Sequence, residues 1–407
     1  MIKRTLVISM LFLAAAMAQT ASWPAFNGVN HDNISTDKGL LKSWPKEGPK
    51  LLWKFDKCGK GYASVSVADN MIFTAGDSKG KTLITAFDMN GKVIWQAENG
   101  KSWTASYPGA RSTPVYSDGM LYQINGSGRL GAFDAKTGEE KWSLNFKGKD
   151  VKGSVGGWGY AESVTIDGDN LLCMPGGSIV LCVALNKKTG ARIWATESIK
   201  DNASYCSGIL VNHKGKKMFL TMSAKYAVGI DPKDGKLLWK FEYPTSYDVH
   251  ATTPVYKDGM VYITSGYGTE DKAIKLNDAG TSAEEAWSET NLDNHHGGVV
   301  MLDGYIYGAG DKYSGWHCIE MKSGKEIWQE NGIGKGSLTY ADGMLYCYSE
   351  KGRVSLIEAS SKSYKEKGKF KLESEGKDPF WNHPVVTGGR LYLRHENNLF
   401  VYDVKDK

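Results

Sequence analysis

The chain has no large excess of charge of either sign. Its 50 Lys and Arg face 45 Asp and Glu, which leaves a formal net charge of +5 over 407 residues, and no basic run is longer than two residues. Such a small excess gives no electrostatic basis for binding nucleic acid or an anionic membrane surface. We therefore expect no nucleic-acid partner.

Long apolar runs are also missing, apart from one at the amino terminus. Residues 1–18 start with Lys3 and Arg4, continue with an apolar run and end at Ala16-Met17-Ala18, the pattern of a signal peptidase site. The run is shorter than the ~20 residues that span a bilayer, so the sequence predicts a cleaved signal peptide and no transmembrane segment. The first cysteine after the run is Cys58, so a lipoprotein anchor is not indicated. We expect a bacterial protein that is periplasmic or secreted.

The six cysteines include no adjacent pair and no C-x-x-C motif. This spacing supports neither a zinc ribbon nor a thioredoxin-type site. Export permits disulfides, and Cys173 and Cys182 flank Pro175-Gly176-Gly177, which would let them face each other across a hairpin. Isolated buried thiols are an equal alternative for the other four.

What the sequence does contain is an internal repeat. Seven tryptophans recur at intervals of 41 to 52 residues, namely Trp53, Trp95, Trp142, Trp194, Trp239, Trp287 and Trp328. Six of them end a phrase in which an apolar strand closes on a polar residue and turns through Gly, as from Asp134 through Thr137-Gly138 to Trp142. A second hairpin signal, Asp-Gly or a close relative, lies between these phrases, and such residues tolerate the positive φ of a type I′ turn.

Each repeat reads as two hairpins, or four antiparallel strands in about 46 residues, which is the unit of a β-propeller blade. The last repeat ends at Val401-Tyr402-Asp403 without a Trp, while Leu51-Leu52-Trp53 opens the chain without a preceding partner. The sequence therefore predicts an all-β fold, a single eight-bladed propeller over residues 51–407. Its ring would be closed by pairing of the amino-terminal strand with the carboxy-terminal blade. We expect residues 19–50 to form an extension that packs on the propeller, and the protein to be a monomer.

The repeated tryptophans are expected to dock between neighbouring blades and to take no part in chemistry. One repeat departs from the pattern. After Glu358 there is neither a turn Gly nor a Trp, so Phe370 or Leu372 is expected to serve in its place.

The phrase Ala132 to Trp142 resembles the repeat of the PQQ-like (quinoprotein) β-propeller superfamily, and the Trp-Asp dipeptide of WD-repeat propellers is absent. The start from Trp23 to Gly28 is similar to exported bacterial members often labelled polyvinyl-alcohol-dehydrogenase-like. One branch of the superfamily, the quinoprotein alcohol dehydrogenases, holds PQQ and calcium on the axis and commonly has a disulfide between adjacent cysteines. Another, the propeller lipoprotein of the barrel-assembly machinery, binds no cofactor and works as a scaffold. The fold alone does not separate these functions.

The innermost strand of each blade starts near the propeller axis, so the residues just before each first hairpin are expected to line the mouth of a central funnel. In chain order they are Tyr62, Arg111, Tyr160, Glu162, Tyr205, His250, His295, His296, Lys335, Trp381, Asn382 and His383. Ionisable and aromatic side chains at equivalent repeat positions are the strongest functional signal in the sequence.

The first of three interpretations is a site for PQQ with calcium. The resemblance would then pair Arg111 and Lys335 with the cofactor carboxylates. It would give stacking to Trp158 or Trp381, and calcium binding or the base to Glu162 with Asn382. Against it stand the missing adjacent cysteine pair, the single acid and a chain much shorter than the large dehydrogenases.

The second interpretation is a metal site of His250, His295, His296 and His383, because imidazole binds zinc, copper or iron. The third is a surface that binds a protein, or a saccharide or other small molecule, since aromatic and Arg side chains are the usual anchors. A binding surface of this kind needs no particular arrangement of metal ligands or catalytic groups. The sequence therefore favours a non-catalytic scaffold with no assigned cofactor. The alternatives are a PQQ-dependent alcohol dehydrogenase-like oxidoreductase and a His-based metal-binding propeller.

Overall fold

A computed structural model describes residues 21–312 and 315–406. The predicted signal peptide, residues 1–18, lies outside the described residues. Within the part of the chain that is described, no helix is long and apolar enough to cross a membrane.

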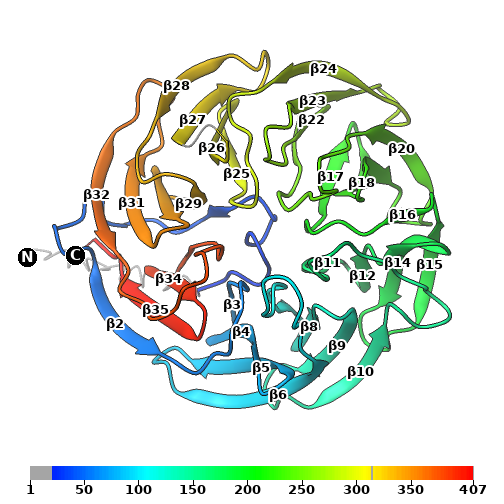
Figure 1. Cartoon of the computed structure of the whole chain (residues 1–407), viewed down its shortest axis with the longest axis horizontal. Helices are drawn as coiled ribbons and strands as arrows, with labels where there is room; N and C mark the ends of the chain where they lie inside the picture. The colour runs from blue at the N-terminus through cyan, green and yellow to red at the C-terminus, as the bar shows by residue number, and fades with distance from the viewer. Residues whose placement is uncertain (1–20, 313–314, 407) are drawn as a thin grey trace, which may run out of the picture.

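The described residues form eight blades of four antiparallel strands arranged as a ring, and a short parallel strand adds to one of them (Figure 1). Blades 1 to 4, each from inner to outer strand, are β3 (Val65–Ala68), β4 (Met71–Ser78), β5 (Lys81–Asp88), β6 (Val93–Lys101); β7 (Val115–Ser117), β8 (Met120–Ile124), β9 (Arg129–Asp134), β10 (Glu140–Asn145); β11 (Thr165–Asp167), β12 (Asn170–Cys173), β14 (Val180–Asn186), β15 (Arg192–Glu197); and β17 (Ile209–His213), β18 (Lys216–Met222), β19 (Tyr226–Ile230), β20 (Leu237–Glu242). Two short strands, β13 (Gly176–Gly177) and β16 (Asp201–Asn202), pair between blades 3 and 4.

The other four blades repeat this order. They are β21 (Val255–Lys257), β22 (Met260–Ile263), β23 (Asp271–Leu276), β24 (Ala283–Glu289); β25 (Val299–Leu302), β26 (Tyr305–Gly310), β27 (Gly315–Glu320), β28 (Glu326–Glu330); β29 (Gly336–Ala341), β30 (Met344–Ser349), β31 (Arg353–Glu358), β32 (Glu366–Lys371); and β33 (Val385–Thr387), β34 (Arg390–His395), β35 (Asn398–Asp403), β2 (Lys50–Phe55).

The two ends of the propeller meet in blade 8. Strand β2 pairs antiparallel with β35, and Trp53 lies opposite Val401. Figure 1 shows the blue β2 directly outside the red β35. The predicted eight-bladed ring and its closure are thus confirmed, and the pairing covers what would otherwise be an open sheet edge.

Six of the seven repeated tryptophans bond to the next blade, whereas the indole N–H of Trp239 bonds to Met218 Sδ in its own blade (3.2 Å). Trp95 donates its indole N–H to Ala135 O (3.0 Å), and a Cβ at Gly138 would lie 2.6 Å from the Trp95 ring. Gly138 also has φ +74°, so the turn requires glycine for both reasons. The same arrangement joins Trp53 to Gly91, Trp142 to Gly190, Trp194 to Gly235 and Trp287 to Gly324.

Blade 7 lacks the repeated tryptophan, and two other aromatic residues, Trp44 and Phe370, take its place. In blade 6, Trp328 on the outer strand lies opposite Cys318, next to a β-bulge. At the corresponding position of blade 7 the outer strand has Gly368, which lies opposite Leu356. Trp44 from the amino-terminal extension covers Gly368, where a Cβ would lie 2.7 Å from the Trp44 Cβ. Phe370 packs onto blade 8 as the repeated tryptophans pack onto their neighbours, since a Cβ at Gly48, just before β2, would lie 2.6 Å from its ring, and the ring lies 5.2 Å from that of Tyr402 on β35. The expectation that Phe370 serves in place of the tryptophan is therefore confirmed.

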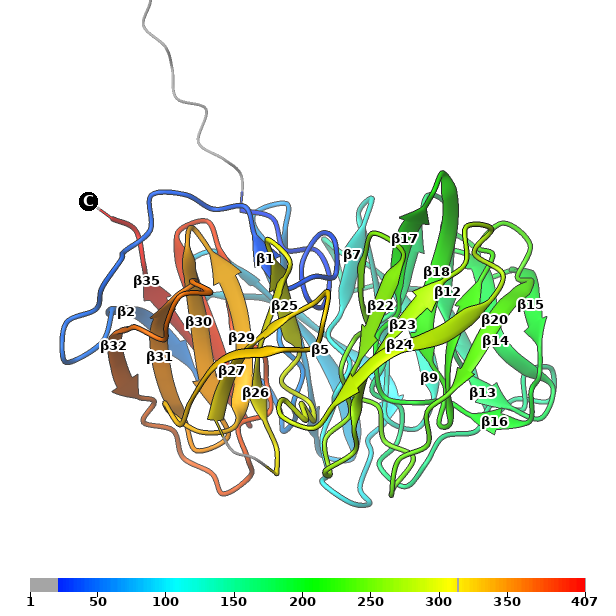
Figure 2. The same ribbon diagram turned by 90° about the horizontal axis from the view of Figure 1, so that it is seen from above.

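Residues 21–49 reach across one face of the ring to its middle (Figures 1 and 2). The Trp23 amide donates to Val67 O in blade 1 (2.7 Å), and the Asn27 amide group donates to Thr253 Oγ1 in blade 5 (3.3 Å). Strand β1 (Ile34–Ser35) pairs parallel with β29 in blade 7. The segment therefore ties together blades that are not neighbours.

All six cysteines lie within the described residues, and each is a buried free thiol. Cys173 lies opposite Val183 in the β12–β14 ladder. Successive side chains of a strand point to opposite faces, so Cys182 does not share the face of Cys173.

Candidate functional site

A cavity of about 660 Å³ lies where the segments that precede the inner strands converge. All eight blades contribute at least one such residue. In blade order, one from each is Tyr62, Arg111, Ser163, Tyr205, Val249, His295, Lys335 and Trp381. We call this space the axial cavity.

Eight of the twelve candidate residues line the axial cavity. They are Tyr62, Arg111, Tyr205, His295, His296, Lys335, Trp381 and His383. The remaining four, Tyr160, Glu162, His250 and Asn382, are buried behind it. Alternation along the extended chain explains the division, because the immediate neighbours of these four face the cavity, as Ala161 and Ser163 do around Glu162.

The four residues behind the wall have structural partners. The Tyr160 hydroxyl donates to Pro175 O (2.9 Å), and the Asn382 amide donates to Ala63 O (2.9 Å). The His250 ring bonds to Ser265 Oγ and Ala224 O, and burial lowers the pKa of His250 to about 4. Glu162 accepts the Met174 N–H (2.9 Å), and burial raises the pKa of Glu162 to about 8.

Sequence reasoning missed two groups of lining residues. Tyr107 and Tyr247 lie further back in the connections between blades, as does Trp158, which the sequence had already given as a possible stacking residue. Tyr267, Asp311 and Glu350 lie in the turns between the second and third strands of blades 5, 6 and 7. A polar or aromatic residue follows the second strand of each of these repeats, and this pattern is the sequence signal that could have identified them.

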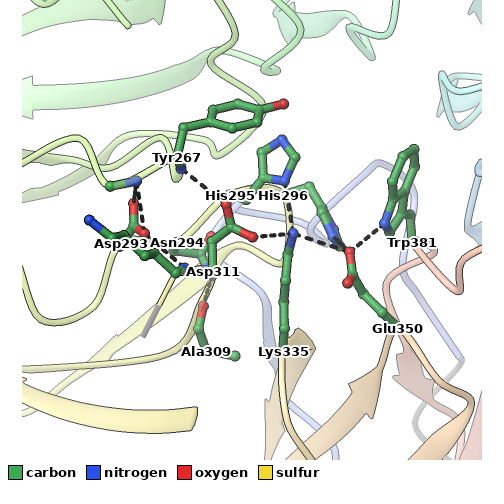
Figure 3. Close-up of polar contacts among 12 residues, drawn as sticks. Tyr267, Asp293, Asn294, His295, His296, Ala309, Asp311, Lys335, Glu350 and Trp381 are labelled. Carbon is green, nitrogen blue, oxygen red and sulfur yellow. Dashed lines mark hydrogen bonds and ion pairs between the residues drawn. The ribbon is translucent and has the colours of Figure 1, made fainter. Parts of the chain in front are cut away.

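One wall of the axial cavity is an ionic network built around Lys335 (Figure 3). Its ammonium lies 2.6 Å from Asp311 Oδ1 and 3.2 Å from Glu350 Oε1, and it donates to His295 Nδ1 (2.9 Å). Glu350 also accepts the N–H groups of His296 Nε2 (2.7 Å) and Trp381 Nε1 (2.5 Å). Lys335 therefore links two carboxylates that come from different blades.

The charges in this network are well defined near neutral pH. Burial alone would raise the pKa of Glu350, but the bond from His296 and the charge of Lys335 lower it to about 2. Burial, with His296 and Lys335 adding to it, lowers the pKa of His295 to about 3. Burial also lowers the pKa of His296, and it lowers that of His383 to about 4. The carboxylates are thus ionised and the imidazoles neutral.

An arc of aromatic rings continues from this wall. Ring centroids are 6.3 Å apart for Trp158 and Tyr247, 4.9 Å for Tyr247 and Tyr267, and 4.4 Å for Tyr267 and His295. Beyond the histidines, Trp381 lies 4.8 Å from Tyr107. The cavity therefore offers several ring faces to one ligand.

Two residues complete the outline of the cavity. The Arg111 guanidinium lies over the Tyr62 ring (5.4 Å) and donates to Ser106, Tyr107 and Gly109 carbonyls, which fixes the loop that carries Tyr107. Phe26 of the amino-terminal segment also lines the cavity, 4.8 Å from the His383 ring.

The histidines expected as metal ligands bond to protein groups. His250 is behind the wall, and His383 Nε2 donates to His296 O (2.8 Å). In residues 21–312 and 315–406, no group of three or more His, Cys, Asp or Glu is placed to hold a metal ion.

Comparison with known proteins identifies the family of this chain. Residues 80–330 match the protein family described as "Outer membrane protein assembly factor BamB". The chain belongs to this family of PQQ-like propellers. It is 23% identical over 321 residues to the outer membrane protein assembly factor BamB of Yersinia pestis, covering 74% of this chain and 75% of that one.

One further relative and one solved structure of similar fold are enzymes by name. The chain is 23% identical over 364 residues to the tetrathionate hydrolase of Acidithiobacillus ferrooxidans, covering 81% of this chain and 69% of the other. The quinohemoprotein alcohol dehydrogenase of Comamonas testosteroni superposes with a TM-score of 0.69 at 12% identity, over 97% of this chain and 82% of that one. At this identity the superposition shows a shared fold.

The residues assigned to PQQ and calcium by resemblance do not fit such a site. Glu162 and Asn382, the expected calcium ligands or base, face away from the axial cavity. Arg111 bonds to backbone carbonyls, and Lys335 is bound by two carboxylates. The groups meant to bind the cofactor carboxylates are therefore already engaged.

Proposed function

We propose that this protein is a non-catalytic propeller scaffold of the bacterial cell envelope and that its axial cavity binds a saccharide. The family membership and the amino-terminal sequence support the envelope location. The cavity volume of about 660 Å³ falls in the usual range of ~300–1,000 Å³ for small-ligand sites.

The observation that carries the proposal is a charge-balanced wall beside an arc of rings. Arg111 and Lys335 supply two positive charges, Asp311 and Glu350 supply two negative charges, and the lining histidines are neutral. A cavity without net charge favours a ligand without net charge. Ionised groups form strong hydrogen bonds to hydroxyls, and ring faces pack on the C–H surface of a sugar.

One ring nitrogen of this wall remains available to such a ligand. His295 accepts from Lys335 at Nδ1, so its Nε2 carries a proton. A ligand hydroxyl that accepts this proton matches the ring.

A protein partner is the second candidate function, and the rim of the cavity favours it. Tyr107 and Tyr247 are 47% and 59% exposed. Exposed tyrosines around a pocket are typical anchors of protein interfaces. In this case an inserted loop would take the place of the saccharide.

Calorimetric titration of the purified protein with neutral and acidic oligosaccharides tests the proposal. We expect a neutral saccharide to bind, and Trp158→Ala to weaken it about tenfold because one stacking face is lost. Ile193→Ala is the control, since Ile193 is 49% exposed on the outer strand β15.

Absence of binding to every saccharide would contradict the proposal, as would equal affinity of the Trp158 and Ile193 variants. Binding of a folded envelope protein that Trp158→Ala abolishes, without saccharide binding, would favour the second candidate.

A further inference from the structure

Two carboxyl groups face each other beneath the wall that carries Tyr267, His295 and Asp311. Asp271 on β23 and Glu289 on β24 are direct cross-strand partners, and their carboxyl groups are in hydrogen-bonding contact. Asp271 is fully buried, and Glu289 is half-buried. Like charges placed directly opposite each other on a sheet are destabilising, and burial makes the repulsion stronger.

One oxygen of each carboxyl group has a backbone donor. Asp271 Oδ2 accepts the Asp293 N–H (2.8 Å) and the Tyr262 hydroxyl (2.8 Å), while Glu289 Oε2 accepts the Asn291 N–H. The other two oxygens, Asp271 Oδ1 and Glu289 Oε1, are buried and have no donor among the described residues. A single proton between these two oxygens would satisfy both.

The groups that face this pair do not neutralise it. From the packed elements these are Tyr262 on β22, Tyr243 after β20 and Asp293 after β24, which are acids or hydroxyls. Burial, and then the charge of Glu289, raises the pKa of Asp271 well above its usual range. Burial likewise raises the pKa of Tyr262 and Tyr243.

The pair is connected to the axial cavity through Asp293. The Asp293 carboxylate accepts the Gly268 N–H (3.0 Å) and the Lys312 N–H (3.0 Å), and each donor directly follows a residue of the wall. Tyr267 also donates its N–H to Asp311 Oδ2 (3.0 Å). Figure 3 shows Asp293 next to Asp311, with dashed lines to the backbone donors. Because Asp271 fixes the Asp293 backbone, the carboxyl pair supports all of these contacts.

We propose that Asp271 and Glu289 share one proton, and that this proton holds Tyr267, His295 and Asp311 in place as one wall of the axial site. Asp271, Glu289 and Asp293 are then positioning residues. At alkaline pH the proton leaves, two negative charges repel each other, and the turn 291–293 loosens. The shared proton does not depend on a bound ligand. Only its expected effect on the affinity for a saccharide rests on the proposed function.

Infrared spectroscopy across a pH titration detects the shared proton, because a protonated carboxyl group has a C=O band distinct from that of a carboxylate. The full chain would carry Glu162→Gln, since Glu162 is itself a buried acid. We expect one buried acid band at neutral pH that disappears at alkaline pH and is absent in Asp271→Asn. Glu284→Gln, an exposed change on the same strand β24, should leave the band unchanged.

Thermal unfolding gives a second readout that is independent of ligand. In the Glu162→Gln chain, Asp271→Asn donates to Glu289 at every pH, so the Tm of this double variant should not fall between neutral and alkaline pH, whereas that of the Glu162→Gln chain should. Glu289→Gln tests the same point if Asp271→Asn does not fold. Absence of the acid band at neutral pH would overturn the proposal. A fall in Tm on adding a chelator would do so too, since a cation would then occupy the pair.

The effect of the shared proton on saccharide affinity is measured in a separate experiment. If a saccharide binds, raising the pH should weaken its binding about tenfold in the parent chain and leave Asp271→Asn unaffected. If no saccharide binds while the acid band behaves as expected, the proposed function fails and the shared proton stands. An affinity that changes equally in both proteins would refute the link to the wall.

Discussion

Glu162 carries a buried proton just behind the axial cavity. Its Oε2 accepts the Met174 N–H, its Oε1 has no partner within residues 21–312 and 315–406, and its neighbours include the thiols of Cys173 and Cys182. Burial raises the pKa of Glu162 to about 8. The folded protein therefore holds a proton here that the unfolded chain releases at much lower pH.

This proton makes stability depend on pH in a defined direction. The folded-state pKa of Glu162 is raised, so the free energy of unfolding is highest below the unfolded pKa of about 4.5 and falls as the pH rises towards about 8. We expect Glu162→Gln to remove this fall and to stabilise the protein at about pH 9 by on the order of 3 kcal/mol relative to the parent chain.

Denaturant unfolding at about pH 5 and about pH 9 measures the effect. Glu242→Gln, on an exposed position of β20, is the matched control and should change neither value. Equal pH slopes in the parent chain and Glu162→Gln would show that Glu162 is ionised in the folded state.

Between elements, a buried guanidinium joins the last blade to the first. Arg394 on β34 is 1% exposed and donates to Thr74 Oγ1 and Ala75 O on β4, and to Gly59 O and Glu396 O. Its fork satisfies four acceptors at the junction of blades 8 and 1, beside the blade in which β2 and β35 are paired without a covalent connection. The strength of the ring at this point thus depends on one side chain as well as on β2.

Arg394→Met should lower the free energy of unfolding by on the order of 3 kcal/mol or more, because several buried acceptors lose their donor. Arg394→Lys should recover only part of this loss, since one ammonium cannot reach acceptors on both sides. Chemical denaturation measures both.

Arg192→Met on the exposed surface of β15 is the control and should stay within about 0.5 kcal/mol of the parent chain. If Arg394→Met is equally mild, the guanidinium does not hold the two blades together.

At the scale of the whole molecule, the amino-terminal extension completes the ring as well as covering its axis. Trp44 packs against Tyr346 (ring centroids 5.8 Å apart) and Phe370 (5.6 Å) and is 7% exposed. It belongs to the apolar cluster shared by blades 7 and 8. The extension therefore adds a second aromatic residue beside Phe370, where the seventh repeat lacks its tryptophan.

Trp44→Ala should destabilise the whole protein by about 3–5 kcal/mol, as expected for a large aromatic removed from a core, even though Trp44 lies outside the repeats. Differential scanning calorimetry measures the change. Val29→Ala, in the same extension but 58% exposed, should have little effect. A small effect of Trp44→Ala would mean that the extension only rests on the propeller.

The repeat was readable from sequence because it is local. The Gly turn and the Trp that follows it, as in Gly138 and Trp142, lie within one hairpin and recur in register. The unpaired Trp53 and the unfinished last repeat also identified the closure. Periodic residues therefore determined the blade count, the strand order and the pairing of β2 with β35.

Only the tertiary structure decided which residues meet across the ring. Glu162 and Ser163 are neighbours in sequence, yet a one-residue alternation turns Ser163 towards the axial cavity and Glu162 away from it. Trp44 fills the place over Gly368, more than three hundred residues away in sequence. Lys335, Asp311 and Glu350 come from different connections and meet because the ring brings them together. A repeat fixes each blade by itself, whereas the site depends on distances between blades that no local pattern encodes.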